Sequence, residues 1–257
     1  MSVLSPKPDI AVRRVRLEAI LRLRDEYRRE MNCQIVHDSW HARGFTDSYL
    51  LTIGEESAGY AAVGGNPGEP KTIIKEFFLL PSYRASALQF FKVLIAVSGA
   101  QMIEAQTNDP LLSLMLYDFA VDLTSNIILF ADGLTTNLTL PNAQFRRMTK
   151  NDHANVFPHT LEPVGDWGLE SDRRIIATGG VLFHYNPPFG DIYLEVDQQY
   201  RRRGCGSYIV QELKRVCRET GHIPAARCRA SNVASRFALQ RGGMFPCARI
   251  LRGRIVT

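Results

Sequence analysis

Hydrophobic residues follow two different spacings along the chain, and this mixture predicts both helices and strands. In residues 12–27 the apolar positions recur at steps of three and four, which is the spacing of one helix face. Shorter runs of β-branched and aromatic residues, bounded by turn residues, are typical of strands. The first half is expected to contain helices over 12–27, after residue 84 and over 111–119, strands over 49–53, 58–63, 72–80 and 102–106, and a hairpin of strands 127–130 and 135–140.

The second half repeats this order of elements. Segments 81–84 (PSYR) and 198–201 (QQYR) are 117 positions apart (201 − 84), and Asn108 and Asn232 are 124 apart (232 − 108). The turn dipeptide Pro141-Asn142 separates two strand-like stretches, which makes it the preferred boundary. We therefore expect two similar domains, residues 1–140 and 141–257. The second is expected to contain strands over 145–148, 167–170, 174–183, 191–196, 225–229 and 250–255, and helices over 151–157, 204–220 and 233–240.

Composition narrows the class of protein. The chain has 257 residues, of which 45% are hydrophobic and 22% charged, and its net charge is +5. This excludes disorder as the main state, because a disordered chain combines low hydrophobicity with high net charge. The charge fits an anionic ligand and is too low to indicate a nucleic-acid partner. An arginine-rich helix face near the N-terminus is matched by its own acidic residues, as on an ordinary solvated helix.

Membrane, metal and redox signals in the sequence bear on the compartment. No run of about 18 apolar residues is present, and residues 1–8 lack the apolar core of a secretory signal. The five cysteines form no C-x-x-C pair, which indicates reduced thiols and no structural zinc. We therefore expect a cytoplasmic protein with no membrane partner and no metal.

The most informative segment is 194–207, LEVDQQYRRRGCGS. A predicted strand leads into a basic loop, two glycines and a helix. Free N–H groups at a helix N-terminus bind anions, and glycine lets a ligand approach the backbone closely. The segment does not match the dinucleotide fingerprint, because position 209 is Ile, and no Lys-Ser or Lys-Thr follows the glycines as in a P-loop. A pyrophosphate of another kind, or an ordinary helix start, remains open.

These residues resemble a known family. Arg201-x-x-Gly204-x-Gly206 is similar to the R/Q-x-x-G-x-G/A loop of the GNAT superfamily of N-acetyltransferases, and Asn232-x-x-Ser235 is similar to the stretch that follows it there. The resemblance covers the second half from about residue 145. It implies an α/β (α+β) fold, here two GNAT-like domains that each have a mixed, mostly antiparallel sheet flanked by helices.

The resemblance also implies how acetyl-CoA, the cosubstrate, would be held. Backbone N–H groups of the loop would bind the pyrophosphate, and Val196 would pair its backbone with the pantetheine arm. Asn232 would contact CoA, although an N-cap role in the next helix is equally compatible with its position. The cofactor-binding residues expected on this basis are Val196, Arg201, Arg202, Arg203, Gly204, Cys205, Gly206, Ser207 and Asn232.

The catalytic groups are less well defined by the sequence. Many members of the family place a tyrosine seven residues after the Asn as general acid, but that position is Leu239 here. Glu195 is the candidate general base, because a carboxylate in the middle of a predicted buried strand is costly unless it is paired or functional. An ion pair with one of the loop arginines is the alternative. His184 is a weaker candidate.

The first half lacks the loop chemistry. At an offset of 117, Ala87 and Gln89 stand where Gly204 and Gly206 stand in the second half. We therefore expect residues 1–140 to be a degenerate GNAT-like domain that binds no CoA, unless it holds a separate ligand. The chain as a whole is expected to transfer acetyl from acetyl-CoA to a small-molecule or peptide amine by direct attack in a ternary complex, as a monomer or homodimer. The alternative is a catalytically silent acyl-CoA-binding or regulatory module.

Overall fold

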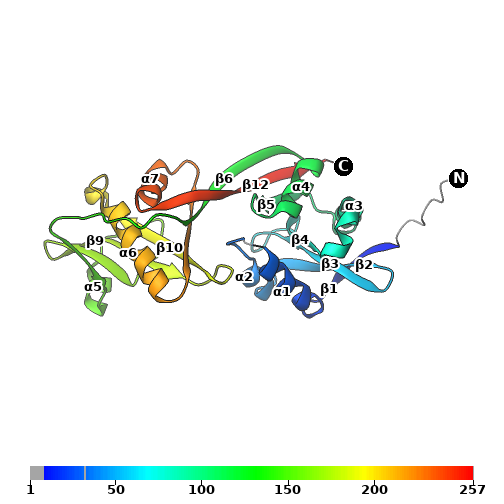
Figure 1. Cartoon of the computed structure of the whole chain (residues 1–257), viewed down its shortest axis with the longest axis horizontal. Helices are drawn as coiled ribbons and strands as arrows, with labels where there is room; N and C mark the ends of the chain where they lie inside the picture. The colour runs from blue at the N-terminus through cyan, green and yellow to red at the C-terminus, as the bar shows by residue number, and fades with distance from the viewer. Residues whose placement is uncertain (1–8, 32, 257) are drawn as a thin grey trace. The chain divides into compact units, whose positions relative to one another are not determined.

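Two compact units make up the protein in the computed structural model, which describes residues 9–31 and 33–256 (Figure 1). Unit 1 contains the chain up to Ser125 and again from Ile250 onward, and unit 2 is the continuous stretch Asn126–Arg249. This division differs from the expected boundary at 140/141. Residues 127–131 pair with residues 225–229 and so belong to unit 2, although they precede the turn at Pro141-Asn142. Residues 1–8, which bear on the secretory-signal expectation, lie outside the described residues.

Unit 1 is a sheet covered by helices on both faces. Phe90 and Met115 pack with Leu51 on one face, whereas Leu23 of α1 packs with Leu50 on the other, as expected for neighbouring residues of one strand. The sheet order is β1-β2-β3-β4-β5-β12, with β4 and β5 parallel and the other pairs antiparallel. The elements are β1 (Ile10–Val15), η1 (Leu17–Ile20), α1 (Leu21–Glu30), α2 (Asp38–Ala42), β2 (Thr46–Ile53), β3 (Glu56–Gly64), β4 (Ile73–Leu79), η2 (Pro81–Ser86), α3 (Ala87–Ser98), β5 (Met102–Gln106) and α4 (Pro110–Phe119).

Unit 2 repeats the plan with the sheet order β7-β8-β9-β10-β11-β6. Its longest helix, α6, lies against the sheet (Figure 1), and Ile209, Val210 and Leu213 of this helix belong to the core. Pairs are antiparallel except that β10 and β11 are parallel. The elements are β7 (Ala143–Arg147), α5 (Lys150–Asn155), β8 (Trp167–Ser171), β9 (Arg174–Leu182), β10 (Phe189–Val196), η3 (Gln198–Tyr200), α6 (Cys205–Glu219), β11 (Ile223–Arg229) and α7 (Val233–Arg241).

Two long strands, β6 (Ala120–Asp132) and β12 (Met244–Ile255), contribute to both units. The second part of β6 pairs with β11 in unit 2, and the last residues of β12 pair with β5 in unit 1. The backbone nitrogen of Val256 also donates to the carbonyl of Phe119 at 3.0 Å. Unit 1 is thus completed by a strand from the end of the chain, whereas the part of β6 that pairs in unit 2 lies at the start of that unit's own stretch of sequence.

Two sequence-based expectations were wrong. Residues 10–15 form β1 and not the start of a helix, because they pair residue for residue with β2, and the α-helix begins only at Leu21. The expected hairpin of 127–130 and 135–140 is absent from the structure described here: the first stretch is part of β6, and the second is not a strand. The backbone of Leu138 is instead bound by the side chain of Gln211, through Leu138 N–H to Oε1 at 2.7 Å.

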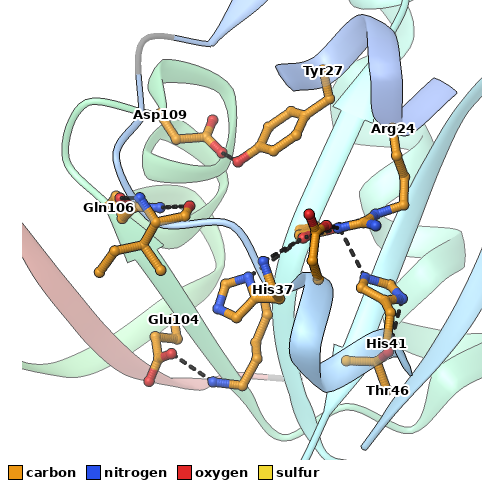
Figure 2. Close-up of polar contacts among 12 residues, drawn as sticks. Arg24, Tyr27, His37, His41, Thr46, Glu104, Gln106 and Asp109 are labelled. Carbon is orange, nitrogen blue, oxygen red and sulfur yellow. Dashed lines mark hydrogen bonds and ion pairs between the residues drawn. The ribbon is translucent and has the colours of Figure 1, made fainter. Parts of the chain in front are cut away.

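Unit 1 contains a buried network of charges, part of which is seen in Figure 2. Glu76 on β4 is fully buried and accepts hydrogen bonds from Arg24 at 3.1 and 3.2 Å and from the His37 N–H at 3.4 Å. Its other oxygen lies 3.1 Å from Nε2 of His41, whose Nδ1 lies 2.9 Å from Thr46 Oγ1. Burial would raise the pKa of Glu76, but these donors outweigh it and hold that pKa well below its usual range.

No helix in the described part of the chain is long and apolar enough to cross a membrane. None of the five cysteines is in a disulfide. Among residues 9–31 and 33–256, no group of three His, Cys, Asp or Glu side chains lies close enough to hold a metal ion.

Removing the charge of Glu76 should destabilise unit 1. In Glu76→Gln, the buried guanidinium of Arg24 keeps its charge and its contact with Asp38 at 2.8 Å but loses its buried ionised partner, which we expect to lower the free energy of unfolding by about 3 kcal/mol. Urea denaturation measures this change. Asp25→Asn is the control: it removes an exposed i,i+3 pair with Arg28 and should cost about 0.5 kcal/mol or less. Equal costs for the two variants would contradict the prediction.

Unit 1 should also depend on the far end of the sequence. A chain ending at Arg249 loses the strand that pairs with β5 and loses Ile255 from the core. We expect hydrogen exchange to accelerate over β4 and β5, while β8–β10 of unit 2 stay protected. A synthetic peptide of residues 250–257 should restore protection in unit 1. Unchanged exchange in the shortened chain would contradict this expectation.

Candidate functional site

The site lies where two parallel strands of unit 2 separate. β10 pairs with β11 only from Phe189 to Asp191, although β10 continues to Val196. Beyond Asp191, β10 keeps its antiparallel partner β9 on one side only. The other edge of residues 192–196 therefore has no β11 partner.

The backbone groups on that open edge belong to every second residue of β10, because successive residues of a strand direct their N–H and C=O groups to alternate edges. The Asp197 N–H donates to the Ile176 carbonyl at 3.0 Å, so odd-numbered residues of β10 point their backbone groups toward β9. The Pro188 carbonyl accepts from the Ile223 N–H at 2.9 Å, so even-numbered residues point toward β11. Leu194 and Val196 therefore direct their backbone groups into the gap. The gap can take an extended chain as an added strand would be taken.

The loop after β10 opens toward solvent before α6 begins. Arg202 and Gly204 have left-handed conformations, with φ of 61° and 88°, and Gly204 is the N-cap of α6. The first N–H groups of a helix have no carbonyl partner within it, here those of Cys205, Gly206 and Ser207. Together with the helix dipole they favour an anion at this position.

A pyrophosphate fits the residues of this loop. A Cβ at Gly206 would lie 3.3 Å from the Cβ of Ala238 and 3.8 Å from Cγ2 of Val196, so a side chain there would crowd the space beside the strand. Gly204 combines positive φ with open space around its Cβ position. The two glycines thus keep backbone N–H groups accessible, which a phosphate group requires.

The three arginines of the loop differ in their surroundings. Arg201 donates from Nε to the Val196 carbonyl at 3.1 Å, which fastens the loop to the end of β10. Arg203 lies over the ring of Tyr200, with its guanidinium carbon 5.3 Å from the ring centroid. The side chains of all three are exposed and add positive potential around the helix start.

Asn232 is the N-cap of α7, which is one of the two roles that the sequence predicted for it. Its Oδ1 accepts from the Ser235 N–H at 3.0 Å. A contact with CoA stays a prediction, and the two roles are compatible because the side-chain nitrogen is not used in this bond.

Glu195 does not pair with a loop arginine. Its carboxylate is 5% exposed and accepts from the N–H groups of Thr160, Leu161 and Glu162 at 3.0 to 3.3 Å, and from the Thr160 hydroxyl at 3.0 Å. Burial would raise the pKa of Glu195, but these hydrogen bonds outweigh it and lower the pKa. The arrangement weakens Glu195 as a base and fastens the segment 160–162 to β10.

The other positions considered for proton transfer lie on α7, before β10 and on β10. Leu239 is 3% exposed, so the position of the family tyrosine belongs to the core. His184 places Nε2 at 3.1 Å from the carboxylate of Asp191. Tyr193 follows on the same strand, and burial together with Asp166 and Glu162 raises its pKa.

The corresponding loop of unit 1 is closed. η2 ends at Ser86 and α3 begins at once with Ala87, whose N–H donates to the Arg84 carbonyl. Matching the helix starts shifts the expected correspondence by one residue: Ser86, not Ala87, stands at the position of Gly204, and Leu88, not Gln89, at that of Gly206. No glycine occurs at either position.

The gap between the parallel strands of unit 1 is also bridged by the chain itself. β4 and β5 pair only at Ile73 and Ile74, and segment 33–37 then spans the two strands. Its His37 N–H bonds to Glu76 on β4, and the Ile35 backbone exchanges two hydrogen bonds with the Gln106 side chain at the end of β5, at 3.2 and 2.8 Å (Figure 2). The position that the gap leaves accessible in unit 2 is thus covered here.

Sequence reasoning missed one residue that supports the site. Lys214 of α6 is 2% exposed, and its Nζ donates to the carbonyls of Leu134, Gly242 and Gly243 at 2.7 to 3.1 Å. It fixes α6 to the segments that follow β6 and α7. The signal in the sequence was a lysine next to Leu213 within the apolar stripe of the helix.

Comparison with known proteins agrees with this geometry. Residues 136–244 match the model of the acetyltransferase (GNAT) family. No curated protein matches the chain at a significant level. Among solved structures, an acetyltransferase of the GNAT family from Colwellia psychrerythraea has a TM-score of 0.75 at 14% identity, covering 96% of this chain and 100% of that one.

Two other solved structures are similar over nearly the whole chain. A GCN5-related N-acetyltransferase from Sphaerobacter thermophilus has a TM-score of 0.57 at 14% identity, covering 98% of each chain. A tandem GNAT protein from the clavulanic acid biosynthesis pathway has a TM-score of 0.58 at 8% identity, covering 96% of this chain and 99% of that one. The fold is therefore shared over both units, and the match to the acetyltransferase (GNAT) family model lies in residues 136–244.

Proposed function

We propose that unit 2 is an acetyl-CoA-dependent N-acetyltransferase that acts on a primary amine in a ternary complex. The observation that carries this proposal is the open edge of β10 next to the helix start at Gly204. An extended pantetheine arm and a pyrophosphate require these two features side by side.

Different residues would bind the different parts of acetyl-CoA. The N–H groups of Cys205, Gly206 and Ser207 would hold the pyrophosphate, with added potential from Arg201, Arg202 and Arg203. Leu194 and Val196 would pair with the pantetheine arm. A backbone N–H at the end of β10 would polarise the thioester carbonyl.

The reaction needs little more than orientation and proton transfer. The amine nitrogen forms a bond to the acetyl carbon as the carbon–sulfur bond breaks, and CoA leaves as a thiol with the proton that the nitrogen loses. Glu195 is the base expected from the sequence. Its contacts favour a positioning role instead, in which the carboxylate holds residues 160–162 beside the acceptor.

Unit 1 is proposed to bind no CoA. Its helix start has no glycine, and segment 33–37 covers the gap between β4 and β5. A catalytically silent acyl-CoA-binding module is the second candidate function, because the tyrosine of the family is replaced by Leu239.

Acetyl-CoA binding should require the glycines of α6. In Gly204→Asp/Gly206→Asp, two carboxylates oppose the pyrophosphate and crowd its position, so we expect affinity to fall by at least about 100-fold, or 2.7 kcal/mol. Titration calorimetry should give one site in the native protein. Release of CoA with a panel of amines then separates an enzyme from a silent binding module.

The control is Gly221→Asp, which places the same side chain on another left-handed glycine beyond the opposite end of α6 (φ 79°). It should leave acetyl-CoA affinity within about twofold, because a charge there is screened from the binding loop. Two sites in the native protein would contradict the proposal for unit 1, and no binding at all would contradict the proposal for unit 2.

Glu195→Gln should show an effect on stability that depends on pH. The lowered pKa means that Glu195 stabilises the fold above the unfolded value of about 4.3, and that this contribution is lost as the pH falls through the folded value. We therefore expect Glu195→Gln to be about 2 kcal/mol less stable than the native protein at pH 7, with the difference shrinking toward pH 3. Urea denaturation at several pH values measures it.

Glu219→Gln, which removes one exposed partner of Arg215, should change stability by about 0.5 kcal/mol or less at every pH. If Glu195→Gln instead keeps full stability and loses turnover with acetyl-CoA affinity unchanged, Glu195 is the base and not an anchor.

A further inference from the structure

Unit 1 contains a cavity that the proposed acetyltransferase function does not use. Its volume is about 300 Å³, which is the lower end of the range for small-molecule sites. It lies beside the first residues of β2 and the turn that precedes them, and its lining includes His41, Gly44, Thr46 and Ser48. A Cβ at Gly44 would meet no atom within 4 Å, so space is open beside this turn.

One wall of this cavity carries a hydroxyl and an imidazole, and a carboxylate binds the far side of the imidazole. Thr46 Oγ1 lies 2.9 Å from Nδ1 of His41 (Figure 2). Nε2 of the same ring lies 3.1 Å from Oε2 of Glu76. Thr46 and His41 line the cavity, and less than a tenth of each residue is exposed. A nucleophile, a base and a group that orients the base are thus hydrogen-bonded in sequence.

The direction of proton donation follows from the charge of Glu76. Burial would raise the pKa of Glu76, but the donors around it hold that pKa well below its usual range. Its carboxylate is therefore ionised and can only accept hydrogen bonds, so Nε2 of His41 carries a proton. In the neutral ring Nδ1 is then the acceptor, and the Thr46 hydroxyl donates to it.

Glu76 can also stabilise a positive charge on the imidazole. Arg24 neutralises Glu76 only in part, because the same guanidinium lies 2.8 Å from Asp38 as well as 3.1 Å from Glu76. Negative charge therefore remains beside Nε2 of His41 when its ring takes a proton. An ionised carboxylate has this role beside the histidine of a Ser-His-Asp triad.

A donor for the opposite charge lies two residues further along β2. Side chains two positions apart on a strand face the same side, so Ser48 lies beside Thr46, and both line the cavity. Arg16 brings a guanidinium to the same lining, whereas the guanidinium of Arg14 is paired with Asp47 at 2.6 Å. A hydroxyl and a guanidinium can stabilise the negative charge that develops on a carbonyl oxygen under attack.

We propose that Thr46 is the nucleophile and His41 the general base of a second catalytic site, which hydrolyses a small carboxylic ester. The size of the cavity limits the ester to a small molecule. This site is independent of the acetyltransferase function proposed for unit 2, because all of its residues belong to unit 1.

The reaction has two steps, and water is the second reactant. Oγ1 of Thr46 forms a bond to the acyl carbon and gives its proton to Nδ1 of His41, and the ester carbon–oxygen bond breaks as the leaving alkoxide takes that proton. Water then attacks the acyl carbon and gives a proton to Nδ1, and the bond from the acyl carbon to Oγ1 breaks as Oγ1 takes that proton back. The products are a carboxylic acid and an alcohol.

The test uses 4-nitrophenyl acetate and the full chain, without acetyl-CoA or an amine, so that unit 2 has no substrates. We expect the native protein to release nitrophenolate faster than the buffer does. Acid quenching during turnover, digestion and mass spectrometry should place an acetyl group on the peptide that contains Thr46.

Variants connect the activity to these residues. His41→Gln should lower kcat/KM by at least about 100-fold, which is the usual contribution of a general base. Thr46→Val should abolish the acetylation of its peptide, and Thr46→Ser should retain it because a hydroxyl remains. The matched control is Thr52→Val on the same strand, since Thr52 is also buried but does not line the cavity. It should leave kcat/KM unchanged, and circular dichroism shows whether each variant is folded.

The native protein alone can overturn this inference. If it releases nitrophenolate no faster than the buffer and no acetyl group is found on the peptide of Thr46, the site does not hydrolyse esters. Acetyl groups found only on other peptides, or release that a folded Thr46→Val retains in full, would also overturn it. The binding of acetyl-CoA to unit 2 is a separate measurement, so the two proposals can fail independently.

Discussion

The short parallel pairing between β10 and β11 is the constraint on which the site depends. A full-length pairing would use the backbone groups of Leu194 and Val196 within the sheet. Because the strands separate after Asp191, those groups face a gap that ends beside the start of α6. Unit 1 has the same separation between β4 and β5, but segment 33–37 spans it. The same separation of two parallel strands thus leaves an open strand edge in one unit and a bridged gap in the other.

The two units also hold a buried glutamate in different ways. Glu76 is stabilised by the side chains of Arg24 and His41, and Arg24 supplies a positive charge beside it. Glu195 is stabilised by backbone N–H groups of a segment without regular structure. Backbone donors leave the net negative charge of Glu195 in place. The face of β10 that carries Glu195 therefore keeps this negative charge.

The sequence predicted the local features well and the long-range ones poorly. The strand ending at Val196 and the helix after Gly204 follow from hydrophobic spacing and from glycine, which act within a few residues. The strand at residues 10–15 was missed because only its pairing with β2 distinguishes it from a helix. The donors to Glu195 come from residues 160–162, more than 30 positions away, and no local pattern marks them. The one-residue shift between the corresponding loops of units 1 and 2 became visible only when the first residues of α3 and α6 were compared.

The placement of β12 has a consequence for how the protein is made. Unit 1 is nearly all synthesised first, yet the strand beside β5 begins only at Ile250, after the whole of unit 2. At the rates of translation the ribosome needs roughly ten seconds to cross that interval. During this time β5 presents an unpaired edge, while unit 2 already receives its β6 strand as it emerges. Unit 2 can therefore fold during translation, whereas the unit that comes first in the sequence is completed last.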